Sequence, residues 1–579
     1  MKLIEALEIV KRPVADAAPG TKVFLACGFT PLHLQTFLAA HFRELHPEVR
    51  LEIKTGRFGD LMGNIERLNP SEIDAVAVLM EWSDLDPRLG IRTLGGWRPA
   101  DLADIVESAG KSGMRMQRAI TGVSQQVPAV VCMPTLPLPP MFPTRPIQAG
   151  ALESQLHRIV SSAAEYLSQV PGVRVANPQL LAEMSAPADR YDVKADLTTG
   201  LPYTLGHAST VGAVLAELIQ NRPAPKGLIT DLDDTLWAGI VGDDGIDGIS
   251  WDLDHHTHLH GLYQQFLSSL AGAGVLIAVA SRNDAALVER AFERKDLLLS
   301  KNDIFPLEIH WSRKSESVRR ILGIWNIGAD AVVFVDDNPM EVAEVKAAFP
   351  EMECRLFPKG DYHGIWKFLR DLRDAFGKPL VTKEDALRLQ SIRDAGAWRN
   401  EGGAVESNSD EFLKSAEACI TLDYGQSTDD ARAFELVNKT NQFNLNGKRF
   451  TESEWRNFFR DPASFMLTAS YRDKYGPLGT IAVVAGKMHG RNAQLHTWVM
   501  SCRAFSRRIE YQCLKYFVEN LGADEINFDY QATARNGPMQ EFLTELLEAP
   551  PASGVSLKRD EFFARSPALF HRVEVTVRA

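Results

Sequence analysis

Three carboxylates fall within four residues at the end of one apolar segment. The stretch from Leu228 to Gly245 reads LITDLDDTLWAGIVGDDG, and Asp231, Asp233 and Asp234 follow its apolar start. Carboxylates this close repel one another unless they share a cation or a proton. The stretch is therefore either an acidic turn or part of a metal site at the carboxyl end of a buried strand.

Two later apolar segments end in polar residues that suit the same chemistry. Ser281 ends one of them and can donate a hydrogen bond to a phosphate oxygen, while Lys314 can supply a positive charge. Asp336 and Asp337 end the other, where their oxygens suit Mg²⁺. One carboxylate of the first segment can attack phosphorus while a second handles the leaving-group proton, so the set fits phosphoryl transfer.

The elements that must position these side chains alternate between strand and helix. Apolar runs at 227–233, 275–281 and 331–337 are separated by helical patterns at 258–274 and 284–293. This order predicts a doubly wound parallel sheet whose site lies at the carboxyl ends of its strands. The spacings leave room for a flap but not for a cap domain. We therefore expect an open site, reached by a large partner or completed by a neighbouring domain.

The flanking sequence predicts two more domains. Before the central region, strand runs enclose a helical run at 32–45, which indicates an α/β domain. After it, helices precede three strand runs and a further helix, which indicates an α+β domain with an antiparallel core. The expected domain bounds are 1–222, 223–377 and 378–579.

The composition excludes several kinds of partner. A chain of 579 residues is too long for one core, and its formal net charge of -12 gives no footprint for nucleic acid. No uncharged apolar run approaches membrane-spanning length, and Glu5 and Glu8 interrupt the N-terminal run, which argues against a signal peptide. The six cysteines show neither a CxxC pair nor zinc spacing. A reducing, cytoplasmic location without membrane partners is expected.

The polar strand ends resemble the four motifs of the haloacid dehalogenase superfamily of phosphohydrolases. DLDDT matches the first motif, and Ser281, Lys314 and VDDNP match the others in order. Lys314 is placed by spacing alone, so an ordinary surface lysine remains an alternative. The resemblance implies these roles: Asp231 as nucleophile, Asp233 as general acid/base, Ser281, Lys314 and Thr235 as phosphate ligands, and Asp231, Asp336 and the main-chain carbonyl of Asp233 as Mg²⁺ ligands.

A longer match points to a narrower family. The segments DLDDTLWAGIVGDDG, SRND, VDDNPME, NKTNQFN and SCR resemble the FkbH family, the glyceryl-transferring phosphatases of polyketide pathways. The resemblance implies that 1,3-bisphosphoglycerate is dephosphorylated and that its glyceryl group is loaded as a thioester on the phosphopantetheine arm of an acyl carrier protein. NKTNQFN, at 438–444, fits either the lining of a site or a structural loop.

Acyl transfer to a thioester needs a thiolate near positive charge, and Cys502 is the best candidate. It follows a strand run, precedes a helix and is followed by Arg503, Arg507 and Arg508. Guanidinium groups and a helix N-terminus both lower the pKa of a thiol. The same arginines can hold the phosphate of a carrier's pantetheine arm. An inert cysteine at a strand end fits the pattern as well.

The region from 378 onward also resembles the GNAT acetyltransferase fold. The coenzyme A turn of that fold, R-x-x-G-x-G/A, would fall on RAFSRR at 503–508. Ser506 and Arg508 stand where the glycines belong, which disfavours close approach of the backbone to a pyrophosphate. A single phosphate held by arginine side chains therefore fits better than acetyl-coenzyme A.

The first domain is similar to the SGNH hydrolase fold in its order of strands and helices. That fold has a serine in a G-D-S turn after its first strand, whereas this chain has ACGFT. Cys27 or Thr30 could replace the serine, with Asp196 and His207 as acid and base. A scaffold or carrier-docking domain in which His207 is structural fits better.

Three functions follow from the sequence. The first is a Mg²⁺-dependent phosphatase and glyceryltransferase that serves a carrier protein. The second is a plain phosphatase for a sugar phosphate or a polysaccharide intermediate, with a separate acyltransferase domain. The third is a carrier-docking subunit without activity. Carrier-dependent release of phosphate separates the first from the second, and absence of turnover with Mg²⁺ favours the third.

Overall fold

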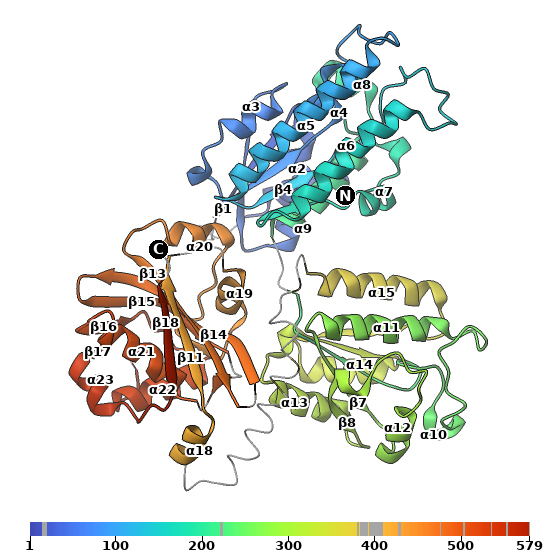
Figure 1. The fold of residues 1–579 in the computed structure, drawn as a ribbon. Coiled ribbons are helices and arrows are strands. Elements are labelled where there is room, and N and C mark those ends of the chain that lie inside the picture. Colours follow the sequence, from blue (N-terminus) through green and yellow to red (C-terminus); the bar gives the residue numbers. More distant parts are fainter. Residues whose placement is uncertain are drawn as a thin grey trace. The chain divides into compact units, whose positions relative to one another are not determined.

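In the structure, a computed structural model, the described residues form three sheets, and the chain divides into two compact units. Figure 1 shows the ribbon. The units are Met1–Arg222 with Phe450–Phe458, and Pro223–Arg449 with Phe459–Ala579. The predicted α/β class is confirmed, whereas the predicted domain bounds stay a prediction. The described residues are 1–13, 20–220, 224–378, 381, 389, 392, 409–426, 430–474, 476–501, 504–505, 507–533, 535–551 and 554–577.

The first unit has a five-stranded parallel sheet in the order β2-β1-β3-β4-β5. The strands are β1 (Gly20–Cys27), β2 (Arg50–Thr55), β3 (Ala75–Leu79), β4 (Ala129–Cys132) and β5 (Val173–Val175). Apolar side chains cover both faces of the sheet, as is usual for parallel sheets. One face packs against α1 (Leu3–Lys11), α2 (Leu32–Leu45) and α9 (Leu205–Ile219). The other packs against α3 (Leu61–Glu66), α5 (Leu102–Ser124) and α6 (Ala151–Ser168).

The central sheet is also parallel, in the order β10-β9-β6-β7-β8. Its strands are β6 (Gly227–Thr230), β7 (Leu276–Ser281), β8 (Ile304–Ile309), β9 (Val332–Asp336) and β10 (Glu353–Leu356). One face packs against α11 (His258–Gly272), α12 (Ala285–Ala291) and α15 (Tyr362–Phe376), and the other against α13 (Lys314–Trp325) and α14 (Pro339–Ala348). Only the short α10 (Val241–Asp244) lies between β6 and α11, so this described stretch holds no cap domain.

The third sheet is mixed, in the order β17-β16-β15-β14-β13-β11-β18, with β12 paired to β15. The strands are β11 (Cys419–Gly425), β12 (Phe443–Asn444), β13 (Ser464–Asp473), β14 (Gly476–His489), β15 (Asn492–Met500), β16 (Glu525–Phe528), β17 (Val555–Lys558) and β18 (Arg572–Val577). Its centre, β11-β13-β14-β15, is antiparallel, as predicted. The helices of this region are α18 (Ser409–Ser415), α19 (Ala431–Lys439), α20 (Glu452–Phe458), α21 (Ile509–Glu519), α22 (Gly537–Leu547) and α23 (Arg559–Arg565).

The helical patterns expected between 379 and 408 fall almost entirely outside the described residues. Within the described part of the chain, no helix is both long and apolar enough to span a membrane. Segment α20 belongs to the first unit, where Arg456 donates a 2.8 Å hydrogen bond to the main-chain oxygen of Ser124. Glu452 forms an ion pair there with Arg174.

A buried polar network ties α9 to the sheet of the first unit. Nε2 of His207 lies 2.9 Å from Oγ1 of Thr135, and its Nδ1 lies 3.0 Å from Oγ of Ser185. The Thr135 hydroxyl donates to Glu81 at 2.8 Å, and the Tyr203 hydroxyl donates to the same carboxylate at 2.7 Å. Burial lowers the pKa of His207 to about 3. Both ring nitrogens therefore serve structural hydrogen bonds in a neutral imidazole.

Replacing His207 by glutamine should reduce the loss of stability that the first unit shows as the pH falls. Below about pH 6.5 the unfolded histidine binds a proton that the folded one excludes, so stability falls as the pH falls. Between pH 7 and 5 the free energy of unfolding should fall by about 2 kcal/mol because of His207, given its folded pKa of about 3. Native-state hydrogen exchange of the α9 amides measures it. His157→Gln, at an exposed position of α6, is the control. Equal pH dependence in both variants contradicts the expectation.

Candidate active site

The candidate site lies where the two central strands of the middle sheet end. β6 and β9 are parallel neighbours, with Thr230 opposite Val335, and the main-chain N–H of Asp231 donates to the oxygen of Val335 at 3.0 Å. In this strand order the connections after β6 and β9 run in opposite directions, and such a switch point is the usual place of a ligand in parallel sheets. Asp231 and Asp336 meet at that position.

Lys314, at the start of α13, joins the two carboxylates. Its ammonium group lies 2.6 Å from Oδ2 of Asp231 and also bonds Oδ2 of Asp336. The residue is only 3% exposed. Burial alone lowers the pKa of Lys314, but the two carboxylates outweigh burial and raise it above its ordinary value. Lys314 is therefore a buried, charged lysine, and the alternative of an ordinary surface lysine does not hold.

The carboxylates carry more negative charge than Lys314 can neutralise. One oxygen each of Asp231, Asp336 and Asp337 lie within 4.8 Å of one another. Burial, followed by the charge of Asp231, raises the pKa of Asp336 to about 7. Oδ1 of Asp231 is buried and has no hydrogen-bond partner among the described residues. A further cation would therefore stabilise the cluster.

This donor set fits the Mg²⁺ that the sequence predicts. Mg²⁺ prefers carboxylate and water oxygens, and the orphaned oxygen of Asp231 offers a ligand that nothing else uses. Asp336 was expected as a ligand, whereas Asp337 is added by the structure. The expected contribution of the main-chain carbonyl of Asp233 stays a prediction.

Asp233 is held rigidly beside the carboxylate cluster. Its Oδ1 accepts hydrogen bonds from the indole N–H of Trp237 at 2.9 Å and from the main-chain N–H of Val241 at 3.1 Å. Its Oδ2 accepts from Asn283 at 2.9 Å. Burial is the largest cause of a raised pKa at Asp233, and the charge of Asp231 adds to it. A fixed carboxyl group with a raised pKa suits a general acid.

The two predicted hydroxyl ligands lie in different surroundings. Ser281 ends β7, next to β6, and is 4% exposed. Thr235 is fully buried, and its hydroxyl has no hydrogen-bond partner in the described part of the chain. Its main-chain oxygen accepts a 2.9 Å hydrogen bond from His260. Contact of either hydroxyl with phosphate stays a prediction.

Two residues at this site, Asn283 and Lys359, were not predicted from the sequence. Asn283 fixes Asp233, and it belongs to the segment SRND, which marked the region without assigning it a role. Lys359, just after β10, lies 2.6 Å from Asp337 and 3.1 Å from Asp234. No motif surrounds Lys359, so only the fold identifies it.

The predicted thiol site is described only in part. Cys502 and Arg503 lie outside the described residues. Arg507 is 3% exposed, with Nε 3.7 Å from the Asp473 carboxylate. A phosphate anchor for an external partner must reach solvent, so the burial of Arg507 does not fit that role. Arg508 pairs with Asp410 at 2.7 Å and keeps a partly exposed side chain.

Among the described residues, no hydrogen bond joins Cys27, Asp196 and His207, the catalytic groups proposed for the first unit. Burial raises the pKa of Cys27 to about 12, and its thiol donates to the main-chain oxygen of Phe29 at 3.2 Å. Asp196 accepts hydrogen bonds from Arg92 and Tyr191, both outside the network of His207. These contacts favour the scaffold interpretation of this domain.

Comparisons with known proteins bear on the fold. No family model matches the chain, and no curated protein matches it. It is similar to the solved N-terminal part of the protein BF1531 from Bacteroides fragilis, which contains a phosphatase domain and was complexed with Mg. That likeness covers 66% of this chain and 100% of that one, at 19% identity and a TM-score of 0.52. A phospholipase A1 from Streptomyces albidoflavus matches over 35% of this chain and 100% of its own, at 14% identity and a TM-score of 0.24, too weak to support an argument. The chain thus shares its fold with a protein that contains a phosphatase domain.

Proposed function

We propose that the protein is a Mg²⁺-dependent phosphohydrolase of the haloacid dehalogenase type, with Asp231 as its nucleophile. The observation that carries this proposal is the buried Asp231, which has one oxygen on Lys314 and the other unpartnered. A carboxylate held in this way has a free electron pair to attack phosphorus. The ion supplies positive charge that offsets the phosphate's own charge when it is bound by Asp231, Asp336 and Asp337.

Residues of the chain itself have separate roles in the proposed phosphoryl transfer. An oxygen of Asp231 attacks phosphorus, and the bond from phosphorus to the leaving oxygen breaks. Asp233, whose raised pKa favours the protonated form, gives its proton to that leaving oxygen. It then takes a proton from the water that cleaves the aspartyl phosphate, which restores both carboxyl groups. Lys314 neutralises charge throughout, and Ser281 donates a hydrogen bond to the phosphate.

We propose further that the substrate is a phosphorylated three-carbon acid, 1,3-bisphosphoglycerate, and that its glyceryl group passes to an acyl carrier protein as a thioester. The match to FkbH-like segments supports this, together with the lack of a cap domain in the described stretch between β6 and α11. Cys502 is the proposed acyl-bearing thiol: its thiolate attacks the C1 carbonyl, the bond from C1 to the phosphate oxygen breaks and phosphate leaves, while Asp231 acts on the phosphate ester at C3. The carrier thiol then takes the glyceryl group and releases the Cys502 thiolate, with Arg503 and Arg508 as the proposed contacts for the carrier. The alternatives are a plain phosphatase and a docking subunit without turnover.

Asp231→Asn should abolish phosphate release from the C3 ester while leaving the fold intact. The amide keeps the shape of the side chain but cannot form the aspartyl phosphate, so the rate should fall on the order of 10³-fold or more. Phosphate release from the C3 ester of 1,3-bisphosphoglycerate measures it, with circular dichroism as the check on folding. Asp243→Asn, at an exposed position of α10, is the matched control. Turnover at the wild-type rate by Asp231→Asn would contradict the proposal that the protein is a phosphohydrolase with Asp231 as its nucleophile.

Asp336→Asn should act on the metal rather than on the nucleophile. Loss of one anionic ligand should raise the Mg²⁺ concentration needed for half-maximal activity by about 10- to 100-fold. Excess Mg²⁺ should restore part of the activity, which it cannot do for Asp231→Asn. The measurement is phosphate release across a Mg²⁺ titration. An unchanged half-saturation point would remove Asp336 from the metal site.

Cys502→Ser should separate acyl transfer from phosphate release. The variant should retain phosphate release that depends on Asp231, yet lose carrier loading, because serine is a far weaker nucleophile than a thiolate. Intact mass measurement of the protein and a holo carrier protein, after incubation with 1,3-bisphosphoglycerate, measures loading. Cys354→Ser is the matched control. Without carrier, the wild type should hold a hydroxylamine-labile glyceryl adduct on the Cys502 peptide. Normal loading by Cys502→Ser would show that the pantetheine thiol attacks the acyl phosphate directly.

A further inference from the structure

A cavity of about 280 Å³ lies at the edge of the central sheet that is opposite to the catalytic carboxylates. Lys226, Leu276 and Ala331 line it, and they stand at the amino ends of β6, β7 and β9. From Lys226 to Asp231 the chain advances five residues through β6, which is about 16 Å at the rise of a strand. A small ligand in this cavity therefore cannot also contact Asp231.

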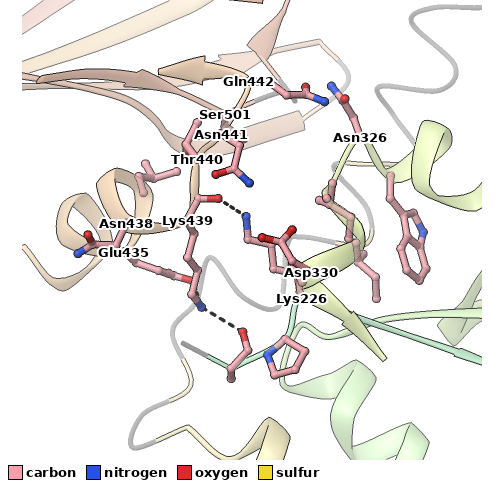
Figure 2. A pocket seen from close by; sticks show the side chains of 18 of the residues that line it. Lys226, Asn326, Asp330, Glu435, Asn438, Lys439, Thr440, Asn441, Gln442 and Ser501 are labelled. Atoms are coloured by element: carbon pink, nitrogen blue, oxygen red, sulfur yellow. Dashed lines mark hydrogen bonds and ion pairs between the residues drawn. The ribbon is translucent and has the colours of Figure 1, made fainter. Parts of the chain in front are cut away.

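The opposite wall of the cavity comes from the NKTNQFN segment, which the phosphatase chemistry leaves without a role. Residues 438–442 of that segment line the cavity, and all the lining belongs to one compact unit. The ammonium group of Lys226 donates to the main-chain oxygen of Lys439 at 2.7 Å, which ties the segment to the start of β6. Figure 2 shows the polar ends of Lys226, Asp330 and Asn441 directed into the space between the two walls.

The charge of the lining is positive. Four basic side chains oppose two acidic ones: Lys226, Arg432, Lys439 and Arg449 against Asp330 and Glu435. Asp330 pairs with Arg535, which is not part of the lining, at 3.0 Å. Glu435 is shared between Arg432 at 2.6 Å and Lys439 at 3.0 Å. Two positive charges are thus in excess, and a partly enclosed site of this kind favours an anion.

The uncharged polar residues of the lining indicate which other groups the ligand carries. Asn326, Asn438, Asn441 and Gln442 offer amide donors and acceptors, and the hydroxyls of Thr440 and Ser501 lie beside them. Groups that both donate and accept match alcohol hydroxyls, which do the same. The volume, near the lower limit for small-molecule sites, suits a ligand of a few carbon atoms.

We propose that this cavity is a second ligand site, which binds a small hydroxylated anion such as a hydroxy acid or its phosphate monoester. It is separate from the phosphatase site, because the two lie at opposite edges of one sheet. Ser501 lines the cavity, and Cys502 is the next residue of the chain. Binding of this ligand does not depend on phosphatase activity.

Isothermal titration calorimetry on the full-length Asp231→Asn protein tests the proposal. EDTA is present so that the metal site cannot retain phosphate, and the probes are D-glycerate, 3-phosphoglycerate, glycerol 3-phosphate and glycerol. We expect the charged probes to bind at a 1:1 ratio and glycerol to bind at least tenfold more weakly. A comparison of the affinities for D-glycerate and glycerol 3-phosphate shows whether the cavity prefers a carboxylate or a phosphate. Failure of all charged probes to bind, or equal binding of glycerol, overturns the proposal.

The variant Gln442→Glu tests whether the charged probes bind in this cavity. It adds a negative charge to the lining with little change of shape, so the affinity for the charged probes should fall by about tenfold or more. Gln442→Met removes the amide without adding charge and should weaken binding less, which keeps the test valid if the first variant misfolds. Gln169→Glu, at an exposed position after α6, is the matched control. Wild-type affinity in both Gln442 variants places the ligand elsewhere and overturns the proposal. Since the readout is binding, this outcome is independent of whether Asp231 supports turnover.

Discussion

The repulsion between buried carboxylates at the centre of the middle sheet constrains most of what surrounds it. Asp231 and Asp336 are 7% and 0% exposed, and a buried charge without a partner is costly. Lys314 bonds both carboxylates, and this pairing is what keeps their charge in the interior. Lys314 and Lys359 together supply two positive charges for the three carboxylates of Asp231, Asp336 and Asp337, so the remaining negative charge favours a cation. The same charge imbalance therefore provides the affinity of the cluster for a metal ion.

The fold meets this constraint by placing the acidic residues on neighbouring strands. In a parallel sheet the carboxyl ends of adjacent strands share one edge, so Asp231 and Asp336 converge although about one hundred residues separate them. Lys314 starts α13 and reaches the same edge from the helix layer. Asp233 is fixed by Trp237, Val241 and Asn283, which come from the flap and from the turn after β7. The described stretch between β6 and α11 holds no cap domain, so these turns supply the rigidity at Asp233.

The sequence predicted the parts of this arrangement that follow from local pattern. The strands ending at Asp231, Ser281 and Asp336 are apolar runs with polar ends, and these are visible without a structure. Asn283 and Lys359 could not be assigned, because their partners are distant in sequence and only strand order brings them close. Arg507 was misjudged for a related reason. A charged side chain is usually exposed, and nothing near it in sequence reveals that Asp473 at the end of β13 meets it in the interior.

The two edges of the central sheet offer different electrostatic environments to anionic ligands. At the carboxyl edge, acidic side chains can bind phosphate only together with a cation, so binding there requires the metal. At the amino edge, the excess of lysine and arginine attracts an anion directly, so binding there should not require it. A ligand that carries both carboxylate and phosphate can therefore be divided between the edges by the supply of metal alone. Under the two proposals above, a dephosphorylated acid would stay bound at the amino ends of the strands while phosphate chemistry continues at their carboxyl ends.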